Sequence, residues 1–422
     1  MAGEWPSLTV GELADSVSDT HKFAKDHLIF LNTSDVLLGK ILHRTYSAVR
    51  DWPGQAKKSI RREDILFSEI RPANGRWAYV DVDADDYVVS TKLMVIRSRR
   101  SRVVPRFLYH FLTSSKTTRW LQHLAESRSG TFPQITFDQV AALELALPPL
   151  EAQTTIAAFL DCISDKIELN RRMNETLEAM ARALFKSWFV DFDPVRAKAE
   201  GSDPGLPKPL ADLFPTHLVD SELGEIPEGW EVGKLGDVIC QRVERCVASA
   251  ETAAQPYVPI DCISPRSLFL MESKPGDEAQ SSLAKFHRGD LLFGAMRPYF
   301  HKVCIAPFDG TTRTTAFVLY PRQERDFAYA TMLLHHPDTI DFVTRHSTGS
   351  TIPYAVWADS MEAMPAILPP SNVRTAFNHA VRPMLARISQ PYFESRALAA
   401  LRDALLPKLI SGGLVPKGSQ QY

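Results

Sequence analysis

The stretch that decides the fold runs from Pro148 to Phe192 and reads PPLEAQTTIAAFLDCISDKIELNRRMNETLEAMARALFKSWFVDF. After the two prolines, apolar residues recur every three or four positions, which is the spacing of one face of a helix. Glu151 lies in the expected first turn, where a carboxylate suits the helix dipole. The stretch therefore predicts one long helix whose apolar stripe packs against a second helix.

A second copy of the stripe begins at Phe377, near the end of the chain. We expect Pro383 and Pro391 to kink or interrupt this copy, because each proline removes a backbone donor. Since both copies carry the stripe, the two helices are expected to form a long antiparallel pair; the alternative is that each helix completes the core of its own domain. The expected interface residues are Ile156, Leu160, Ile163, Ile167, Leu177, Met180, Leu184, Trp188, Phe377, Val381, Ile388, Leu398, Leu401, Leu405 and Leu409.

The two stripes belong to a duplication of the whole chain. The segment Asp64–Phe67 (DILF) recurs as Asp290–Phe293 (DLLF), and an Arg-Pro pair follows each of them. Further on, SGTFP at 129–133 recurs as GSTIP at 349–353, and LPP at 147–149 recurs as LPP at 368–370. Matches that keep one order with nearly constant offsets indicate two copies of one unit.

Each copy begins with a mixed part and ends with the long helix. In the first copy, Ile65–Phe67 and Tyr87–Ile96 are expected to be strands, while Phe107–Thr113 and Thr118–Glu126 are expected to be short helices. The predicted fold class is α+β, with two pseudo-two-fold-related heads joined by two long antiparallel helices that act as a coiled-coil-like spacer. The expected divisions are a first head (1–147), a central helix (148–192), a linker (193–221), a second head (222–367) and a C-terminal helix (368–415).

Composition excludes several classes of protein. No apolar run is long enough to span a membrane, and the segment 1–20 lacks the pattern of a signal peptide. The chain has five cysteines, an odd number, and no CxxC pair, so we expect neither disulfides nor a zinc site. We therefore expect a cytoplasmic location. A net charge of −2 argues against a protein that coats nucleic acid by charge alone. Local basic clusters occur at 57–62 and 97–102, and these are either DNA contacts or solvated loops.

Three segments resemble the specificity subunits of type I restriction–modification systems. They are GEIPEGWEV at 224–232, LPPLEAQ at 147–153 leading into IAAFL at 156–160, and LFKSWFVDF at 184–192. The resemblance covers essentially the whole chain. The second copy departs from the pattern at Pro383 and Pro391, and its Ser371 follows the two prolines where the first copy continues with Leu-Glu-Ala-Gln.

The resemblance implies that each head is a target-recognition domain that reads one half of a bipartite duplex DNA site. It also implies that the long helices space the heads and bind two methyltransferase subunits, and that motor–nuclease restriction subunits complete the complex. S-adenosylmethionine, ATP and magnesium are then expected on the partner subunits, and this chain is expected to bind no cofactor and to cross no membrane.

The sequence predicts neither a catalytic nor a metal site in this chain. It contains no (Asn/Asp)-Pro-Pro-aromatic tetrapeptide to hold a target amine and no GxxxxGK[ST] loop for ATP. Two other readings remain as alternatives. One is a two-headed protein-interaction adaptor, and the other is a metal-dependent nuclease that uses Asp261, Glu272 and Lys274.

Residues that read DNA are expected to be polar, to lie on loops, and to occupy the same place in both copies with different identities. Two loops meet this description: the turn after the repeated strand, and the Ser/Gly/Thr loop before the repeated proline. The candidates are Ser68, Glu69, Arg71, Asn74, Arg128, Ser129 and Thr131 in the first copy, and Arg297, Tyr299, His301, Ser347, Thr348, Ser350 and Thr351 in the second. The matching Arg71 and Arg297 are expected to contact phosphate or to support the fold, because two heads that read different sequences should not share their base readers.

Overall fold

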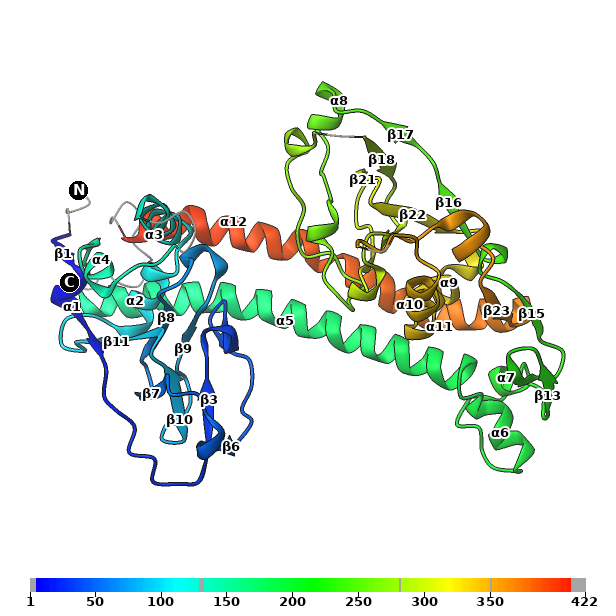
Figure 1. Ribbon diagram of the computed structural model, residues 1–422, viewed down its shortest axis with the longest axis horizontal. Helices are drawn as coiled ribbons and strands as arrows, with labels where there is room; N and C mark the ends of the chain where they lie inside the picture. Colours follow the sequence, from blue (N-terminus) through cyan, green and yellow to red (C-terminus); the bar gives the residue numbers. More distant parts are fainter. Residues whose placement is uncertain (1–4, 129–132, 281, 350, 411–422) are drawn as a thin grey trace. The chain divides into compact units, whose positions relative to one another are not determined.

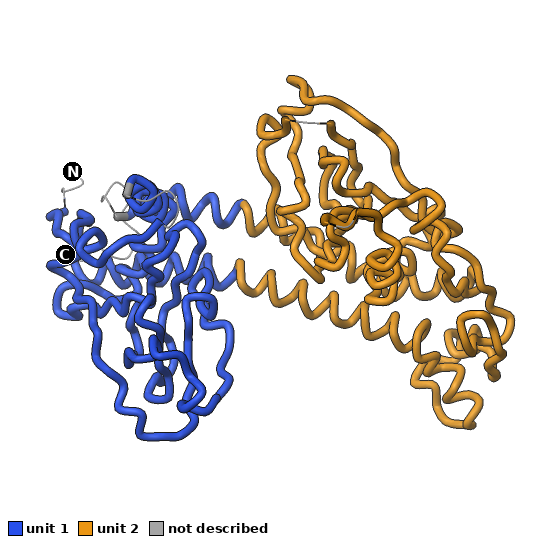
Figure 2. The backbone as a smooth tube through the Cα atoms, viewed as in Figure 1, with its two compact units in different colours: residues 1–166, 397–422 blue, residues 167–396 orange. Residues whose placement is uncertain are grey.

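A computed structural model of the chain describes residues 5–128, 133–280, 282–349 and 351–410. The chain divides into two compact units (Figure 2). The first unit holds residues 1–166 and 397–422, and the second unit holds residues 167–396. The first unit therefore combines segments from both ends of the chain, and the long helices are divided between the units.

Each unit contains a four-stranded antiparallel sheet with the same strand order. The order in the first unit is β2 (Ala14–Val17), β11 (Leu93–Ser98), β8 (Ile65–Ser68), β9 (Trp77–Tyr79). The order in the second unit is β16 (Ile239–Arg242), β22 (Ala316–Pro321), β19 (Leu291–Gly294), β20 (Val303–Ile305). The two repeated DILF and DLLF segments form β8 and β19, so the duplication in the sequence is a duplication of the fold.

The second sheet distinguishes the two units. In the first unit its order is β6 (Ser47–Ala48), β3 (His27–Leu31), β10 (Tyr87–Ser90), β7 (Ala56–Ser59), and in the second unit it is β17 (Arg245–Cys246), β18 (Leu283–Phe286), β21 (Gly310–Arg313). The single strand expected over Tyr87–Ile96 was wrong, because β10 and β11 lie in different sheets. Between them the chain turns at Thr91, where the Ser90 hydroxyl accepts a hydrogen bond from the Lys92 N–H at 3.3 Å.

Two helices follow the shared sheet in each unit. They are α2 (Pro105–Leu112) and α3 (Ser115–Arg128) in the first, and α9 (Phe327–Leu334) and α10 (Pro337–Arg345) in the second. The first two begin earlier than the sequence predicts. Pro105 takes the first position of α2, where its missing N–H is not needed. The Ser114 hydroxyl accepts a hydrogen bond from the Thr117 N–H at 3.2 Å and so caps the start of α3.

The first and last strands of each head pair with each other. β1 (Ser7–Thr9) pairs with β12 (Glu144–Ala146), and β15 (Glu231–Lys234) pairs with β23 (Pro365–Leu368). This closure places the start of each long helix beside the start of its own head. The remaining helices and strands are short: α1 (Val10–Leu13), β4 (Val36–Leu37), β5 (Lys40–Ile41), α4 (Phe137–Ala141), α6 (Asp193–Ala199), α7 (Lys208–Ala211), β13 (Leu218–Ser221), β14 (Gly224–Pro227) and α8 (Ala250–Ala253).

The predicted central helix is α5 (Leu150–Phe189), a single helix of 40 residues (Figure 1). In the first unit, Ile156 and Leu160 near its start are buried in one core with Leu406 and Leu409 of α12 (Pro391–Ile410). The last helix of the chain therefore completes the core of the first unit.

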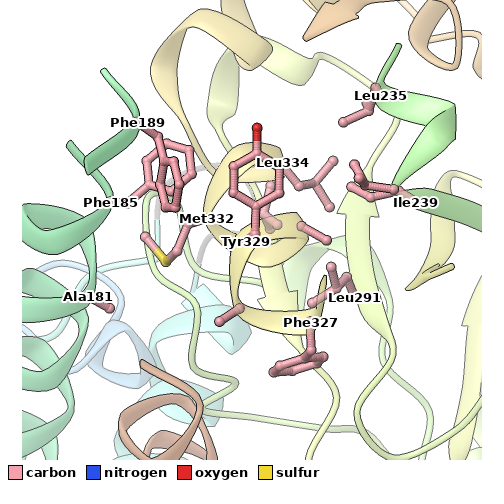
Figure 3. Packing of buried hydrophobic residues seen from close by; sticks show 14 of the residues in the cluster. Ala181, Phe185, Phe189, Leu235, Ile239, Leu291, Phe327, Tyr329, Met332 and Leu334 are labelled. Atoms are coloured by element: carbon pink, nitrogen blue, oxygen red, sulfur yellow. The ribbon is translucent and has the colours of Figure 1, made fainter. Parts of the chain in front are cut away.

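In the second unit, the end of α5 supplies a group of aromatic side chains to the core. Phe189 lies 4.9 Å from Phe377 of α11 (Ser371–Ser389) and 5.0 Å from Tyr329 of α9, measured between ring centroids. Trp188 lies 5.6 Å from Phe377 in the same way. Figure 3 shows Phe185 and Phe189 beside Tyr329. The second core is thus completed by the helix that begins in the first copy.

Buried polar contacts show that the two helices run antiparallel within the second unit. Asn170 donates a hydrogen bond to Glu394 at 2.8 Å, and Asn174 donates one to the carbonyl of Ile388 at 3.1 Å. The residue numbers of the hydrogen-bond partners fall as the residue numbers along α5 rise, so the predicted antiparallel pairing is confirmed. The helices also complete head cores, so the two interpretations left open by the sequence both describe part of the structure.

The C-terminal helix is interrupted once. Pro391 begins α12 after α11 ends at Ser389, which confirms the break expected there. At Pro383, where the sequence predicts a kink or an interruption, α11 continues without interruption. Pro383 lies on the exposed side of α11, where water can satisfy the carbonyl that loses its helical partner.

Most residues of the expected interface stripe are buried or half-buried. Buried members are Ile156, Leu160, Ile163, Trp188, Phe377, Val381, Ile388 and Leu409, and half-buried members are Ile167, Leu177, Leu184, Leu398 and Leu405. Two members were wrong, because Met180 is 47% exposed and Leu401 is 45% exposed. The buried face of α5 shifts around the helix toward its end, to Ala181, Phe185 and Phe189.

We expect Trp188→Ala to lower the free energy of unfolding of the second unit by about 3–5 kcal/mol, because it leaves a cavity among Phe214, Phe377 and Phe189. Met180→Ala on the same helix is the control, and it should change stability by less than about 0.5 kcal/mol. Urea unfolding followed by circular dichroism measures both. Equal losses in the two variants would contradict the assignment of the buried face.

Candidate nucleic-acid interface

In the first unit, the turn after the repeated strand is hydrogen-bonded to Pro133 and Ile135, in the segment that begins at the repeated proline. The Arg71 N–H donates to the Pro133 carbonyl at 3.1 Å, and the Ile135 N–H donates to the Glu69 carbonyl at 2.9 Å. Arg71 has φ 44°, in the left-handed region that residues other than glycine rarely adopt. The loop contacts hold the turn in this conformation.

The second unit repeats this geometry with different side chains. The Arg297 N–H donates to the Pro353 carbonyl at 2.8 Å, and the Ala355 N–H donates to the Ala295 carbonyl at 2.8 Å. Arg297 has φ 52°, matching Arg71. In each unit, the turn after the repeated strand and the segment that begins at the repeated proline therefore lie side by side, although they are far apart in the sequence.

A third turn, which the sequence analysis missed, joins each site. The Glu69 N–H donates to the Lys92 carbonyl at 3.2 Å, and the Ala295 N–H donates to the Thr315 carbonyl at 2.9 Å. Lys92 is exposed, and Thr315 is its counterpart in the second copy. The only sequence signal is the weak match of Thr91-Lys92 with Thr314-Thr315 between two apolar strands. In each unit, we call the described residues of these three segments a recognition site.

The first recognition site presents Arg71 and Asn74 to solvent, while Glu69 is half-buried. Ser68 was wrongly expected to be exposed: it is buried, and its hydroxyl is engaged by the backbone of Ile70. The side chain of Arg128 and the residues Ser129 and Thr131 lie outside the described residues.

The second recognition site presents an aromatic residue, Tyr299, which is 49% exposed. Thr348 and Thr351 are also exposed, and Arg297 is half-buried. The expectation that His301 is exposed was wrong, because it is buried with its ring nitrogen 3.0 Å from the His335 carbonyl. Ser347 is half-buried, and its hydroxyl donates to the Val343 carbonyl. Burial lowers the pKa of His301. Ser350 lies outside the described residues.

The basic cluster at 97–102 is largely neutralised within the fold. Arg97 makes a bidentate pair with buried Asp64 at 2.8 and 2.7 Å. Arg99 and Arg100 pair with Asp15 and Glu63. These arginines therefore support the strand that leads into the recognition site instead of offering a free cationic surface.

In the cluster at 57–62, Lys58 has a structural role. Its ammonium donates to the carbonyls of Thr91 and Leu93, at 3.1 and 2.9 Å. Burial lowers its pKa. Lys58 thus braces the third turn of the first recognition site.

The strand that leads into the second recognition site is supported in the same way. Arg242 forms a bidentate pair with buried Asp290 at 2.8 and 3.1 Å. Asp290 is the counterpart of Asp64 in the duplicate, but its partner comes from β16, whereas the partner of Asp64 comes from β11. The buried carboxylate is common to both units, and the arginine that neutralises it is not.

The structure offers no support for the nuclease alternative. Among the described residues, no group of three or more His, Cys, Asp or Glu side chains could hold a metal ion. Lys274 lies 3.8 Å from Glu278. No helix in the described parts of the chain is both long enough and apolar enough to cross a membrane.

Comparisons with known proteins identify relatives of this chain. Residues 3–179 match a family model described as the type I restriction modification DNA specificity domain. The HindI specificity subunit of a type I restriction enzyme from Haemophilus influenzae is 32% identical over 459 aligned residues, covering 97% of this chain and 99% of that protein. The MjaIX specificity subunit from Methanocaldococcus jannaschii is 28% identical over 331 residues, covering 74% and 69%.

A solved structure shares the fold. The S subunit of a type I restriction–modification system from M. genitalium superposes with a TM-score of 0.54 at 12% identity, and the match covers 96% of each chain.

We expect Arg242→Ala to destabilise the second unit by about 3 kcal/mol, because Asp290 would stay buried without a charged partner. Exposed Arg245, for which no ion pair is seen among the described residues, is the matched control, and Arg245→Ala should change stability by less than about 0.5 kcal/mol. Hydrogen exchange of β19 and β22 reports the loss locally. Unchanged protection in Arg242→Ala would show that the pair does not support the recognition site.

Proposed function

The chain belongs to the specificity subunits of type I restriction enzymes, and we propose that its two recognition sites each read one half of a bipartite duplex DNA target. The chain is a non-catalytic subunit that recognises the DNA on which the complex acts. The supporting observation is the recognition site itself, built twice on the same sheet with the same backbone contacts.

The two recognition sites share a backbone geometry but differ in their side chains, as expected of two sites that recognise different DNA sequences. Asn74 and Lys92 of the first site stand where the second site carries Phe300 and Thr315. An exposed amide is suited to the paired donor and acceptor of an adenine edge, whereas an aromatic ring suits the methyl group of thymine. We therefore assign Asn74 to base reading in one half of the target. In the other half we assign base reading to Tyr299, the exposed aromatic residue next to Phe300, together with exposed Thr348.

The two positive-φ arginines have a different role. Arg71 and Arg297 share an identity, a backbone conformation and a hydrogen bond to the opposite loop. A group shared by two different readers carries no sequence information, so these guanidinium groups contact phosphate. They place each turn on the duplex, and the neighbouring side chains read it.

Specificity subunits of type I systems work with methyltransferase and restriction subunits. We propose that two methyltransferase subunits bind, because each copy presents an equivalent helix start, at Leu150 of α5 and Ser371 of α11. The length of the helical segment would set the gap between the two half-sites. S-adenosylmethionine, ATP and magnesium would be held by the partner subunits, and the complex would act in the cytoplasm, where its DNA is.

Sequencing of methylated genomic DNA tests the proposal. The chain is assembled with its methyltransferase partner, and the modified motif is read before and after substitution. The unaltered complex should yield a bipartite motif, and Asn74→Ala should relax one position in one half only, by about 1–3 kcal/mol of discrimination. The other half of the motif is the internal control. Relaxation of both halves, or methylation without any sequence dependence, would contradict the proposal.

Arg71→Gly separates placement from reading. Glycine accepts the positive φ of this position without strain, so the substitution removes the guanidinium and keeps the turn. We expect weaker binding of every duplex alike, with the slope of log K against log salt reduced by about 0.9, as for one phosphate contact. The motif should not change. A change of motif would make Arg71 a base reader instead.

A further inference from the structure

We propose that one exposed face of α3, formed by Lys116, Arg119, Trp120 and His123, binds the phosphate backbone of duplex DNA beside the first recognition site. The second unit lacks this contact. We call these four residues the α3 face. The inference rests on the proposed function, because it extends the DNA surface of the first unit.

The α3 face follows from the helical repeat. Its residues are spaced three and four apart, so they project from one side of α3. All four are exposed, and the indole of Trp120 is 53% exposed. The opposite side of α3 is buried through Leu121 and Ala125 in the core of the first unit.

The cations of the α3 face are not neutralised within the described parts of the chain. Lys116 has no carboxylate within ion-pair distance there, and Arg119 donates only its Nε–H, to the carbonyl of Ser115 at 3.0 Å. The carboxylate nearest in the helix, that of Glu126, accepts a hydrogen bond from Gln122 at 2.7 Å. Arg97, Arg99 and Arg100 differ from these cations, because each of them forms an ion pair with a carboxylate.

The α3 face adjoins the recognition site. The Gln122 side chain accepts a hydrogen bond from the Ala73 N–H at 3.1 Å, which fixes α3 against the turn that carries Arg71 and Asn74. A duplex seated on that turn would bring its phosphates toward the neighbouring helix. Lys116 and Arg119 can pair with phosphate oxygens, and the indole N–H of Trp120 can donate to one.

Comparison of α3 with its counterpart in the second copy favours DNA over a protein as the partner of the α3 face. At the corresponding positions of the second copy, α10 carries Asp338, Asp341, Phe342 and Arg345. Two cations are replaced by two carboxylates, and the Phe342 ring is covered by His346 at 4.0 Å between ring centroids. A methyltransferase bound equivalently to both copies would need the same surface on each. A surface present in one unit alone fits a contact to one half of the DNA.

The test uses the full chain assembled with its methyltransferase partner and a fluorescent duplex that carries the target. The double substitution Lys116→Asp with Arg119→Asp copies the residues of α10, a helix that folds with aspartate at both places. A second variant, Lys116→Gln with Arg119→Gln, removes the charges without adding repulsion. Arg345→Ala, on the exposed face of α10, is the matched control.

The Lys116→Gln, Arg119→Gln variant should reduce the slope of log K against log salt by about 1.8, as for two phosphate contacts, and weaken binding roughly tenfold at moderate salt. The aspartate variant should weaken binding further, because it adds repulsion. Target and unrelated duplexes should be affected alike, and the methylated motif should stay the same. DNA should also quench a part of the tryptophan emission that is missing in Trp120→Phe. The Arg345→Ala control should keep the original slope.

An unchanged slope in the Lys116→Gln, Arg119→Gln variant would overturn the proposal. Loss of the methyltransferase from the purified complex would also overturn it, because the α3 face would then be a protein interface. Failure of the unaltered complex to bind its target duplex is a separate result, which would contradict the proposed function and not merely this contact.

Discussion

The burial of one copy's helix end in the other copy's core is the interaction on which the rest of the structure depends. Phe185, Trp188 and Phe189 leave the first copy along α5 and pack around Phe377 and Tyr329 of the second unit. In return, Leu406 and Leu409 of α12 enter the core of the first unit. Each core is therefore incomplete without a segment from the other copy. Neither half of the duplicated chain contains all the apolar surface that its own head needs.

Polar residues in the helix pair then fix its register. Asn170, Asn174 and Glu178 follow one another at four-residue intervals on α5, and all three are buried. Glu178 accepts hydrogen bonds from the Leu268 N–H at 3.1 Å and from Arg182 at 2.8 Å, and burial raises its pKa. A purely apolar seam could slide by one turn at little cost, whereas a slide here would strand buried polar groups. The register of the helices is thereby tied to the position of the second head.

The sequence predicted what depends on repetition and periodicity. The matched DILF and DLLF segments located equivalent strands, and the three- and four-residue spacing located α5 to within two residues of its start. Periodicity alone could not place Met180 outside the interface or Phe185 inside it, because a 3.6-residue helix drifts relative to a regular stripe over 40 residues. Local identity likewise could not show that His301 is buried while its neighbour Tyr299 is exposed. That distinction arises from contacts with His335, which is distant in the sequence.

The junction between head and helix shows how two copies of one fold can carry different surfaces. In the first unit, Gln153 at the start of α5 accepts from the Val104 N–H at 2.7 Å and donates to the Pro148 carbonyl at 2.8 Å. At the equivalent place in the second unit, Arg374 lies 2.9 Å from buried Asp326. One junction is a neutral amide network and the other is an ion pair.

These two solutions are not interchangeable one residue at a time. Asp326 belongs to the second head and Arg374 to the helix that follows it, so joining that head to a helix that carries glutamine would leave a buried carboxylate without its cation. A head must therefore be exchanged together with the first turn of its own helix. The matched unit extends past Gln153 in the first copy and past Arg374 in the second, a few residues beyond the Leu-Pro-Pro segments at which the sequence repeat suggests a boundary.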